Sequence, residues 1–238
     1  MGSTDNLERL LAQKKAIEGE IAATPAYARG LQDLRVWQAG RLAQTYADLR
    51  REPRYSAAVE FFLRDLYGPQ DMSRRDRDLS RALSYFKRVL PVAALEVLEL
   101  AVTLDVLSAE LDQAMAEQLA NGPLTDAAYA EAYCRVGRAS ERRRQIKLLI
   151  GIGEGLERIV RNRWIGAALL AARVPARAAG LGELQGFLER GFAAFRKMKG
   201  AQPLLKVIRA RETQLMDELF GGAGREFGET GAMRAGAP

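Results

Sequence analysis

The sequence predicts an all-α protein, a single helical bundle of about seven or eight helices with two long central antiparallel helices. Apolar residues recur at three- and four-residue spacing in nearly every segment, and no segment alternates apolar and polar residues as a strand does. The breaks between these segments are only one to six residues long, which is typical of a compact helical domain.

Prolines and glycines divide the first half of the chain into four predicted helices. Thr24 is expected to cap the helix that begins at Pro25, and Ser73 with Asp76 resembles a capping box. The predicted helices are a first through Leu7 and Ile21, a second from Pro25 until Pro53, a third from Tyr55 to Leu66, which stops at Gly68-Pro69, and a fourth from Ser73 to about Arg88.

The second half begins with the two longest predicted helices. Thr125 is expected to cap the helix that follows the Asn121-Gly122-Pro123 turn, and Val174-Pro175 is expected to close that stretch. The predicted helices are one from Pro91 to about Leu119, one or two between Thr125 and about Arg173 with a break at Gly137 to Ser140, one from Gly180–Gly182 to near Met198, and a last one from Pro203. Residues 1–220 therefore form one predicted all-helical domain, and the glycine-rich residues 221–238 a disordered tail.

Charge is unevenly distributed along the two long helices. Residues 89–134 hold eight acidic residues and no Lys or Arg, whereas residues 135–177 hold eleven basic and three acidic residues. Because a short turn at 121–125 would fold the two helices into an αα-hairpin, opposite charges would flank a shared apolar seam.

The basic stretch has two further interpretations: it faces a charged partner protein, or it forms a solvent-facing stripe that binds nucleic acid or another polyanion. The candidate polyanion-binding residues are Arg142, Arg143, Arg144, Lys147, Arg158 and Arg161. No helix-turn-helix, zinc-finger or RNA-recognition signature accompanies them.

Composition excludes several kinds of chemistry. The chain has no histidine and one cysteine, Cys134, so it has no His-ligated metal site, Ser-His-Asp triad, intrachain disulfide or Cys-rich zinc site. No cofactor or metal is predicted. The apolar stretch 89–107 carries three acidic residues, which argues against a membrane span. No secretory or myristoylation signal is visible, so a cytoplasmic location is expected.

A dense run of charge after the short apolar helix is the first place to expect a polar small-molecule site, or else an ordered ion-pair network. The ligand-site candidates are Asp65, Tyr67, Asp71, Arg75 and Asp78. The Glu96 and Glu99 carboxylates share a helix face and are a weaker candidate for metal binding or acid–base work. Gly151, Gly153 and Gly155 match neither a Rossmann loop nor a P-loop, and they predict close helix packing.

Two segments, residues 60–69 (EFFLRDLYGP) and 180–189 (GLGELQGFLE), resemble an uncharacterised all-helical family of bacterial proteins with no known activity. The likeness spans most of residues 27–220. It implies a bacterial cytosolic setting and a single helical unit, and it carries no functional residue over to this chain.

Three functional hypotheses follow. The first is a non-catalytic helical protein–protein interaction or regulatory module, which binds a protein partner or itself. The second is a nucleic-acid or polyanion-binding protein that uses the basic 135–163 stretch. The third is a small-ligand or metal-dependent enzyme that uses the carboxylates of 65–78 or of 96–99.

Overall fold

The structure is a computed structural model that describes residues 3–23, 25–66, 78–79, 81–82, 91–119 and 123–221. Every regular element among these residues is helical and none is a strand, which confirms the all-α class. The elements are α1 (Ser3–Ala22), α2 (Pro25–Thr45), α3 (Ala47–Arg51), α4 (Ser56–Phe61), a π-helical turn η1 (Phe62–Leu66), α6 (Val92–Leu119), α7 (Asp126–Val136), α8 (Ala139–Val160), α9 (Arg163–Ala178), α10 (Gly182–Met198) and α11 (Gln202–Phe220).

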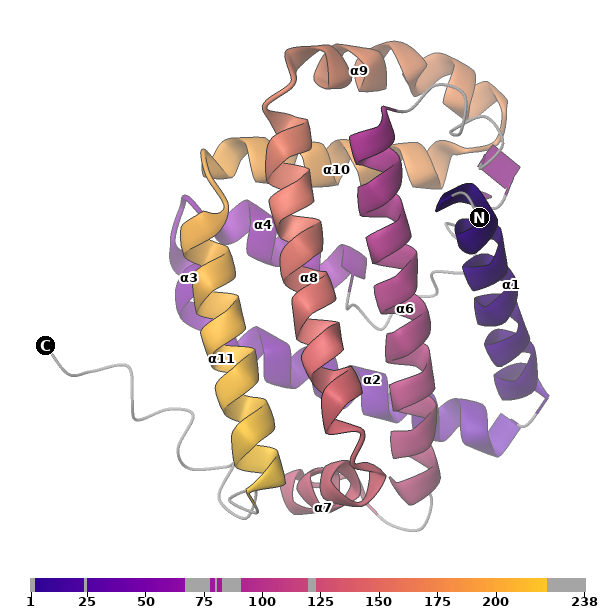
Figure 1. Cartoon of the computed structure of the whole chain (residues 1–238), viewed down its shortest axis with the longest axis vertical. Coiled ribbons are helices and arrows are strands. Elements are labelled where there is room, and N and C mark those ends of the chain that lie inside the picture. The colour runs from indigo at the N-terminus through magenta and orange to yellow at the C-terminus, as the bar shows by residue number, and fades with distance from the viewer. Residues whose placement is uncertain are drawn as a thin grey trace, which may run out of the picture.

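The helices pack in two layers with caps at both ends. In Figure 1, α11, α8, α6 and α1 lie side by side in the front layer, and α2, α3 and α4 lie behind them. α9 and α10 cross one end of the bundle, and α7 crosses the other. α6 and α8, of 28 and 22 residues, pack against each other more extensively than any other pair in the described part of the chain. The apolar faces of both layers therefore meet in the space between α2, α4, α6, α8 and α11.

Two glycines of α8 permit this close packing, as their spacing predicts. A Cβ atom at Gly155 would overlap Cγ2 of Val97 on α6, and one at Gly153 would overlap the end of Leu205 on α11. Gly151 is less crowded, since its Cβ would lie 3.5 Å from Leu100. The packing interpretation of the glycine run is thus supported, with Gly153 and Gly155 at the two tight contacts.

The described residues contain ten α-helices and one π-helical turn, more than the seven or eight predicted. One extra boundary lies at Tyr46, which separates α2 from α3. Another lies at Asn162, whose side-chain oxygen accepts a hydrogen bond from the Trp164 N–H at 3.0 Å and caps α9. Apolar periodicity does not reveal these short interruptions, because the pattern resumes at once on the other side.

Several predicted boundaries agree with the structure, and one does not. The Thr125 side chain caps α7 by accepting from the Ala128 N–H at 3.2 Å, and α7 ends at Gly137, which has a φ of 64°. The predicted end at Pro175 is wrong, because α9 continues to Ala178. The Pro175 carbonyl still accepts a hydrogen bond from the Ala179 N–H at 3.0 Å. The proline therefore costs the helix only the hydrogen bond that its missing N–H would have donated. The predicted cap at Thr24, the capping box at 73–76 and the tail beyond 221 lie outside the described residues.

Candidate functional site

A cavity of about 150 Å³ lies in the middle of the bundle. Its wall comes from α2, α4, α6, α7, α8 and α11, with Phe62 and Leu63 of the π-helical turn. π-helical turns are rare and are often found at functional sites. The wall includes two arginines, Arg41 and Arg142, which is unusual because arginine is almost never buried without a partner.

Arg41 is neutralised inside the bundle by a partner from the far end of the sequence. Its Nη1 and Nη2 atoms lie 3.4 and 3.3 Å from the two carboxylate oxygens of Glu212, and the Tyr46 hydroxyl donates to the same carboxylate at 2.7 Å. Burial opposes the charge on Arg41, but the Glu212 carboxylate outweighs it and raises the pKa of Arg41 above its ordinary value. Burial and then the Glu212 charge raise the pKa of Tyr46, so its hydroxyl stays a donor.

Asp112 on α6 supplies the second carboxylate of the wall. It accepts a hydrogen bond from Gln38 Nε2 at 3.1 Å, and Arg35 Nε lies 3.7 Å from its other oxygen. Burial raises the pKa of Asp112 above its ordinary range, although the nearby Arg35 charge opposes this rise. Beside it, Gln145 on α8 donates to the Ser108 hydroxyl at 2.8 Å, which joins α6 and α8 across the cavity wall.

Arg142 on α8 differs from these groups, because its charge has no acidic partner at ion-pair distance in the described residues. Its residue exposure is 5%, and its guanidinium carbon lies 4.3 Å from the ring centre of Tyr133 in a cation–π contact. The buried Nε and Nη2 atoms of Arg142 have no hydrogen-bond partner among the described residues, and neither does Nε of Arg41. Burial raises the pKa of Tyr133 to about 12, so at neutral pH this ring carries no charge to balance Arg142. The cavity wall thus holds three arginine nitrogens without a hydrogen-bond partner among the described residues, and one arginine, Arg142, without an ion pair there.

Helical spacing explains why Arg142 faces inward. Arg142, Ile146, Leu149 and Gly153 are spaced 4, 3 and 4 residues apart, so they share one stripe of α8. That stripe faces α11 and the cavity, since Arg142, Ile146 and Leu149 all line the cavity. The sequence predicts Arg142 as part of a polyanion-binding surface, but its side chain is inside the bundle, whereas the adjacent Arg143 and Arg144 are exposed.

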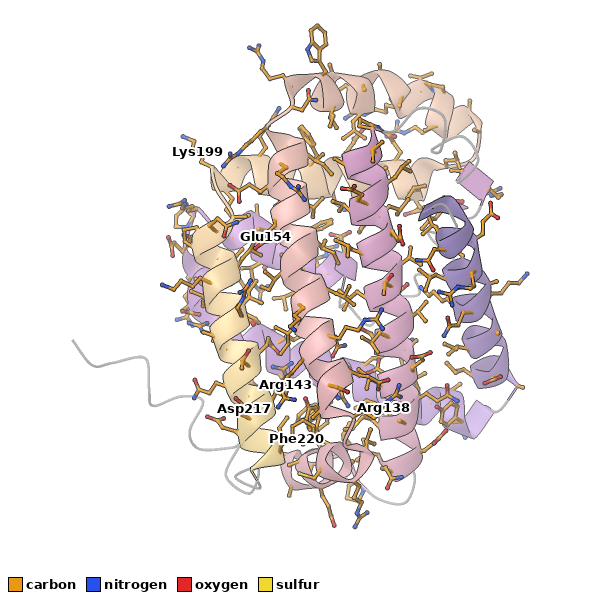
Figure 2. The ribbon with its side chains drawn as sticks, in the orientation of Figure 1. Arg138, Arg143, Glu154, Lys199, Asp217 and Phe220 are labelled. Carbon is orange, nitrogen blue, oxygen red and sulfur yellow. The ribbon has the colours of Figure 1, made fainter. Side chains whose placement is uncertain are left out.

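The remaining candidate polyanion-binding residues lie on the outside of α8. Arg143, Arg144, Lys147, Arg158 and Arg161 are all exposed. Arg161 donates to Glu157 one turn earlier at 2.6 Å, and the outer residue Glu154 pairs with Arg209 of α11 at 3.8 Å. Figure 2 shows Arg143 on α8 and Asp217 on α11, toward the end of the bundle that α7 crosses.

The acidic residues of α6 do not pair mainly with this basic face. Asp105 pairs with Lys14 of α1, and Glu110 lies 3.7 Å from Arg138 at the start of α8. Within the described ranges, Arg138 is the one basic residue of the 135–177 stretch that forms an ion pair with a carboxylate of α6. The expected seam of opposite charges between the two long helices is thus limited to one end.

Asp65 and Asp78, the two predicted small-ligand residues that the structure describes, do not line the cavity. Asp65 accepts two hydrogen bonds from Arg190 of α10, at 2.9 and 2.5 Å, and Asp78 pairs with Arg81 at 2.5 Å. Tyr67, Asp71 and Arg75 lie outside the described residues. Of the predicted carboxylate pair, Glu96 is exposed and Glu99 accepts from Asn6 at 2.5 Å. No group of three or more acidic, cysteine or histidine residues that could hold a metal ion occurs in the part of the chain that the structure covers.

Comparisons with known proteins place the chain in a family. A family model described as Domain of unknown function (DUF8198) matches residues 19–226. Neither a curated protein nor a solved structure matches the chain. None of the described helices combines the length and the apolar composition that crossing a membrane requires.

Proposed function

The chain belongs to the family described as Domain of unknown function (DUF8198), and we propose that it binds a small anion in the cavity between α2, α6, α8 and α11. One observation carries this proposal: Arg142 is buried beside the cavity with two guanidinium nitrogens that lack a partner. Leaving a buried donor without a partner costs about 1–3 kcal/mol, and more when the donor is charged. An anion in the cavity would satisfy these donors and pair with the Arg142 charge.

The anion would reach donors from two layers of the bundle. Arg142 belongs to α8 in the front layer, and Arg41, whose Nε atom is also unpartnered, belongs to α2 in the back layer. Arg41 is already fixed by Glu212, so its orientation does not depend on a ligand. The site is therefore organised before the anion arrives, which reduces the entropic cost of binding.

This function is tested by measuring the melting temperature of the purified protein in sodium benzoate, sodium acetate or sodium phosphate. Sodium chloride at equal ionic strength is the reference. An anion at about 100 times its Kd adds about 2.7 kcal/mol to the free energy of unfolding. For a chain of this length, we expect the melting temperature to rise by about 5–10 °C. Arg142→Met is expected to abolish that rise, because methionine fills similar space without a charge or a donor.

The adjacent Arg143→Met variant is the matched control, since Arg143 is exposed on the same helix turn. It is expected to keep the full rise in melting temperature. Without an added anion, Arg142→Met is expected to melt at the same temperature as the wild type or higher, because it removes an unpartnered buried cation. An equal rise in the wild type and Arg142→Met, or no rise with any of the three anions, would contradict the proposed site.

As a second candidate function, we propose self-association through the outer face of α9, which is a form of the predicted interaction module. No residue of α9 is buried, and Trp164, Leu170 and Val174 are 83%, 61% and 76% exposed. The inner face of α9 contacts α10, where the Leu169 carbonyl accepts from Gln185 at 2.6 Å and Arg173 pairs with Glu189 at 2.8 Å. The outer apolar face has no such contact among the described residues, and exposed apolar patches commonly mark interfaces.

Light scattering across a concentration series tests this second function. The wild type is expected to dimerise as its concentration rises, and Val174→Glu to remain monomeric, because a carboxylate would be buried in the dimer contact. Val92→Glu is the matched control, since Val92 of α6 is 72% exposed and lies outside α9. A wild type that stays strictly monomeric, or equal weakening by both substitutions, would rule out this interface.

A further inference from the structure

The cavity is lined by both charged and apolar side chains. The charged ones are Arg41, Asp112, Arg142 and Glu212, from α2, α6, α8 and α11. The apolar ones include Val59, Phe62, Leu204, Ile208 and Leu215, from α4, η1 and α11. A purely polar anion would leave the apolar side chains without contacts, so the complementary ligand has an anionic end and an apolar body.

The two unpartnered atoms of Arg142 define the anionic group. Nε and Nη2 lie on one edge of the planar guanidinium group, and their N–H bonds point in the same direction. Two parallel N–H donors at this spacing match the two oxygens of a carboxylate. The Tyr133 ring centre lies 4.3 Å from the guanidinium carbon, so this ring supplies a cation–π contact and no hydrogen-bonding oxygen for that edge.

The charges around the cavity favour a ligand with one negative charge. Arg41 and Arg142 line the cavity with two positive charges, and Glu212 lines it with one negative charge. Asp112, whose pKa burial raises, adds a second negative charge only when it is ionised, so the surplus is one positive charge when Asp112 is protonated. A monocarboxylate balances it, whereas a dianion would bring a second negative charge into a space that already holds two carboxyl groups.

The volume limits the apolar body. An apolar cavity of about 150 Å³ can take up a molecule the size of benzene. The cavity here has the same volume of about 150 Å³, and Arg142 is one of its lining residues. The body that fits has about six carbon atoms, as a single ring or a short branched chain.

From these observations we infer that the ligand is a monocarboxylate with a compact apolar body, held by a two-point contact to Nε and Nη2 of Arg142. This inference rests on the proposed function and names its ligand class. Arg142 sets the carboxylate end, and the side chains of η1, α4 and α11 select the body.

Fluorescence of Trp37 provides a direct readout. Trp37 stacks on Tyr129, whose ring lines the cavity, at 4.0 Å between ring centres. The chain has two tryptophans, so Trp164→Phe leaves Trp37 as the sole indole reporter. In this background, benzoate, acetate, benzyl alcohol, phthalate and inorganic phosphate are titrated, with calorimetry on the wild type to check each Kd.

Benzoate is expected to bind at least about 100-fold more tightly than acetate, since each buried methylene adds about fourfold in affinity. Benzyl alcohol, which keeps the ring and lacks the carboxylate, is expected to bind at least about 100-fold more weakly than benzoate. Phthalate and phosphate are expected to be weaker than benzoate by about tenfold or more. Arg142→Lys is expected to lose about tenfold or more for benzoate, because an ammonium group cannot make the two-point contact.

The outcomes that would contradict the inference also distinguish a wrong ligand class from a wrong binding site. If acetate, phosphate or phthalate binds as tightly as benzoate and Arg142→Met abolishes binding, the anion site stands and the ligand class is wrong. If benzyl alcohol equals benzoate, carboxylate recognition is wrong. If none of the anions binds, the proposed function fails and this inference fails with it. The comparison among ligands uses intact Arg142, so it remains decisive even if an Arg142 variant does not fold.

Discussion

Glu212→Gln is expected to lower the free energy of unfolding by about 3–5 kcal/mol, as measured by urea denaturation. Glutamine keeps the shape of glutamate but removes its charge, which leaves Arg41 as a buried cation without a carboxylate. The two side chains are 18% and 15% exposed, so solvent screens their interaction only weakly. The Tyr46 hydroxyl also donates to this carboxylate at 2.7 Å and would lose a charged acceptor.

Glu154→Gln is the matched control for this prediction. Glu154 also pairs with an arginine, Arg209 at 3.8 Å, but these side chains are 45% and 62% exposed. An exposed pair contributes about 0–1 kcal/mol, so the control is expected to unfold almost as the wild type does. The double variant Arg41→Met with Glu212→Met is expected to recover much of the lost stability, because it leaves no unpaired charge. Equal effects of Glu212→Gln and Glu154→Gln would show that the buried pair is not important for stability.

Gly155→Ala is expected to lower the free energy of unfolding by about 1–3 kcal/mol, although alanine normally stabilises a helix. The added methyl group would overlap Cγ2 of Val97, a buried β-branched side chain with one strongly preferred helical rotamer. α6 and α8 must then move apart, which loosens one wall of the cavity. Urea denaturation gives the size of the effect.

Gly40→Ala provides the control for the glycine prediction, because a methyl group added there on α2 would meet no neighbouring atom within 4 Å. The free energy of unfolding of that variant is expected to rise by about 0.5–1 kcal/mol. Adding Val97→Ala to Gly155→Ala is expected to restore part of the loss, which a double-mutant cycle measures as a coupling energy. A stabilising effect of Gly155→Ala would contradict the close approach of α6 and α8.

The helical class and many helix ends follow from local sequence, since they depend on spacing and capping. The place of Thr125 after Gly122-Pro123 predicts a cap, and its side chain makes the expected hydrogen bond. Pro203 predicts the start of the last helix in the same way. Asn162 is also a good capping residue, but no proline or glycine marks the break beside it, so the sequence pattern does not reveal that boundary.

The cavity could not be predicted from local patterns, because its parts are distant in sequence. Arg41 and Glu212, which pair inside it, are 171 positions apart. Nothing in either neighbourhood specifies the partner residue, and their contact arises only when α2 and α11 pack in opposite layers.

One signal in the sequence does point to Arg142. Arg142, Arg143 and Arg144 form a basic run, yet successive residues of a helix point about 100° apart, so the three cannot share one face. Continuing the apolar stripe of Gly153, Leu149 and Ile146 back by four residues reaches Arg142. A charged residue in a core stripe is a stronger indication of a site than three adjacent charges, because it must be desolvated to fold.

A crystal structure of the protein with benzoate would decide whether Arg142 holds a carboxylate inside the bundle. We expect density for one benzoate in the cavity, with its carboxylate oxygens within hydrogen-bond distance of Nε and Nη2 of Arg142 and its ring against the side chains of η1 and α11. Benzoate bound only on the outer, basic face of α8, or a cavity that holds only ordered water in saturating benzoate, would show that Arg142 does not form this site.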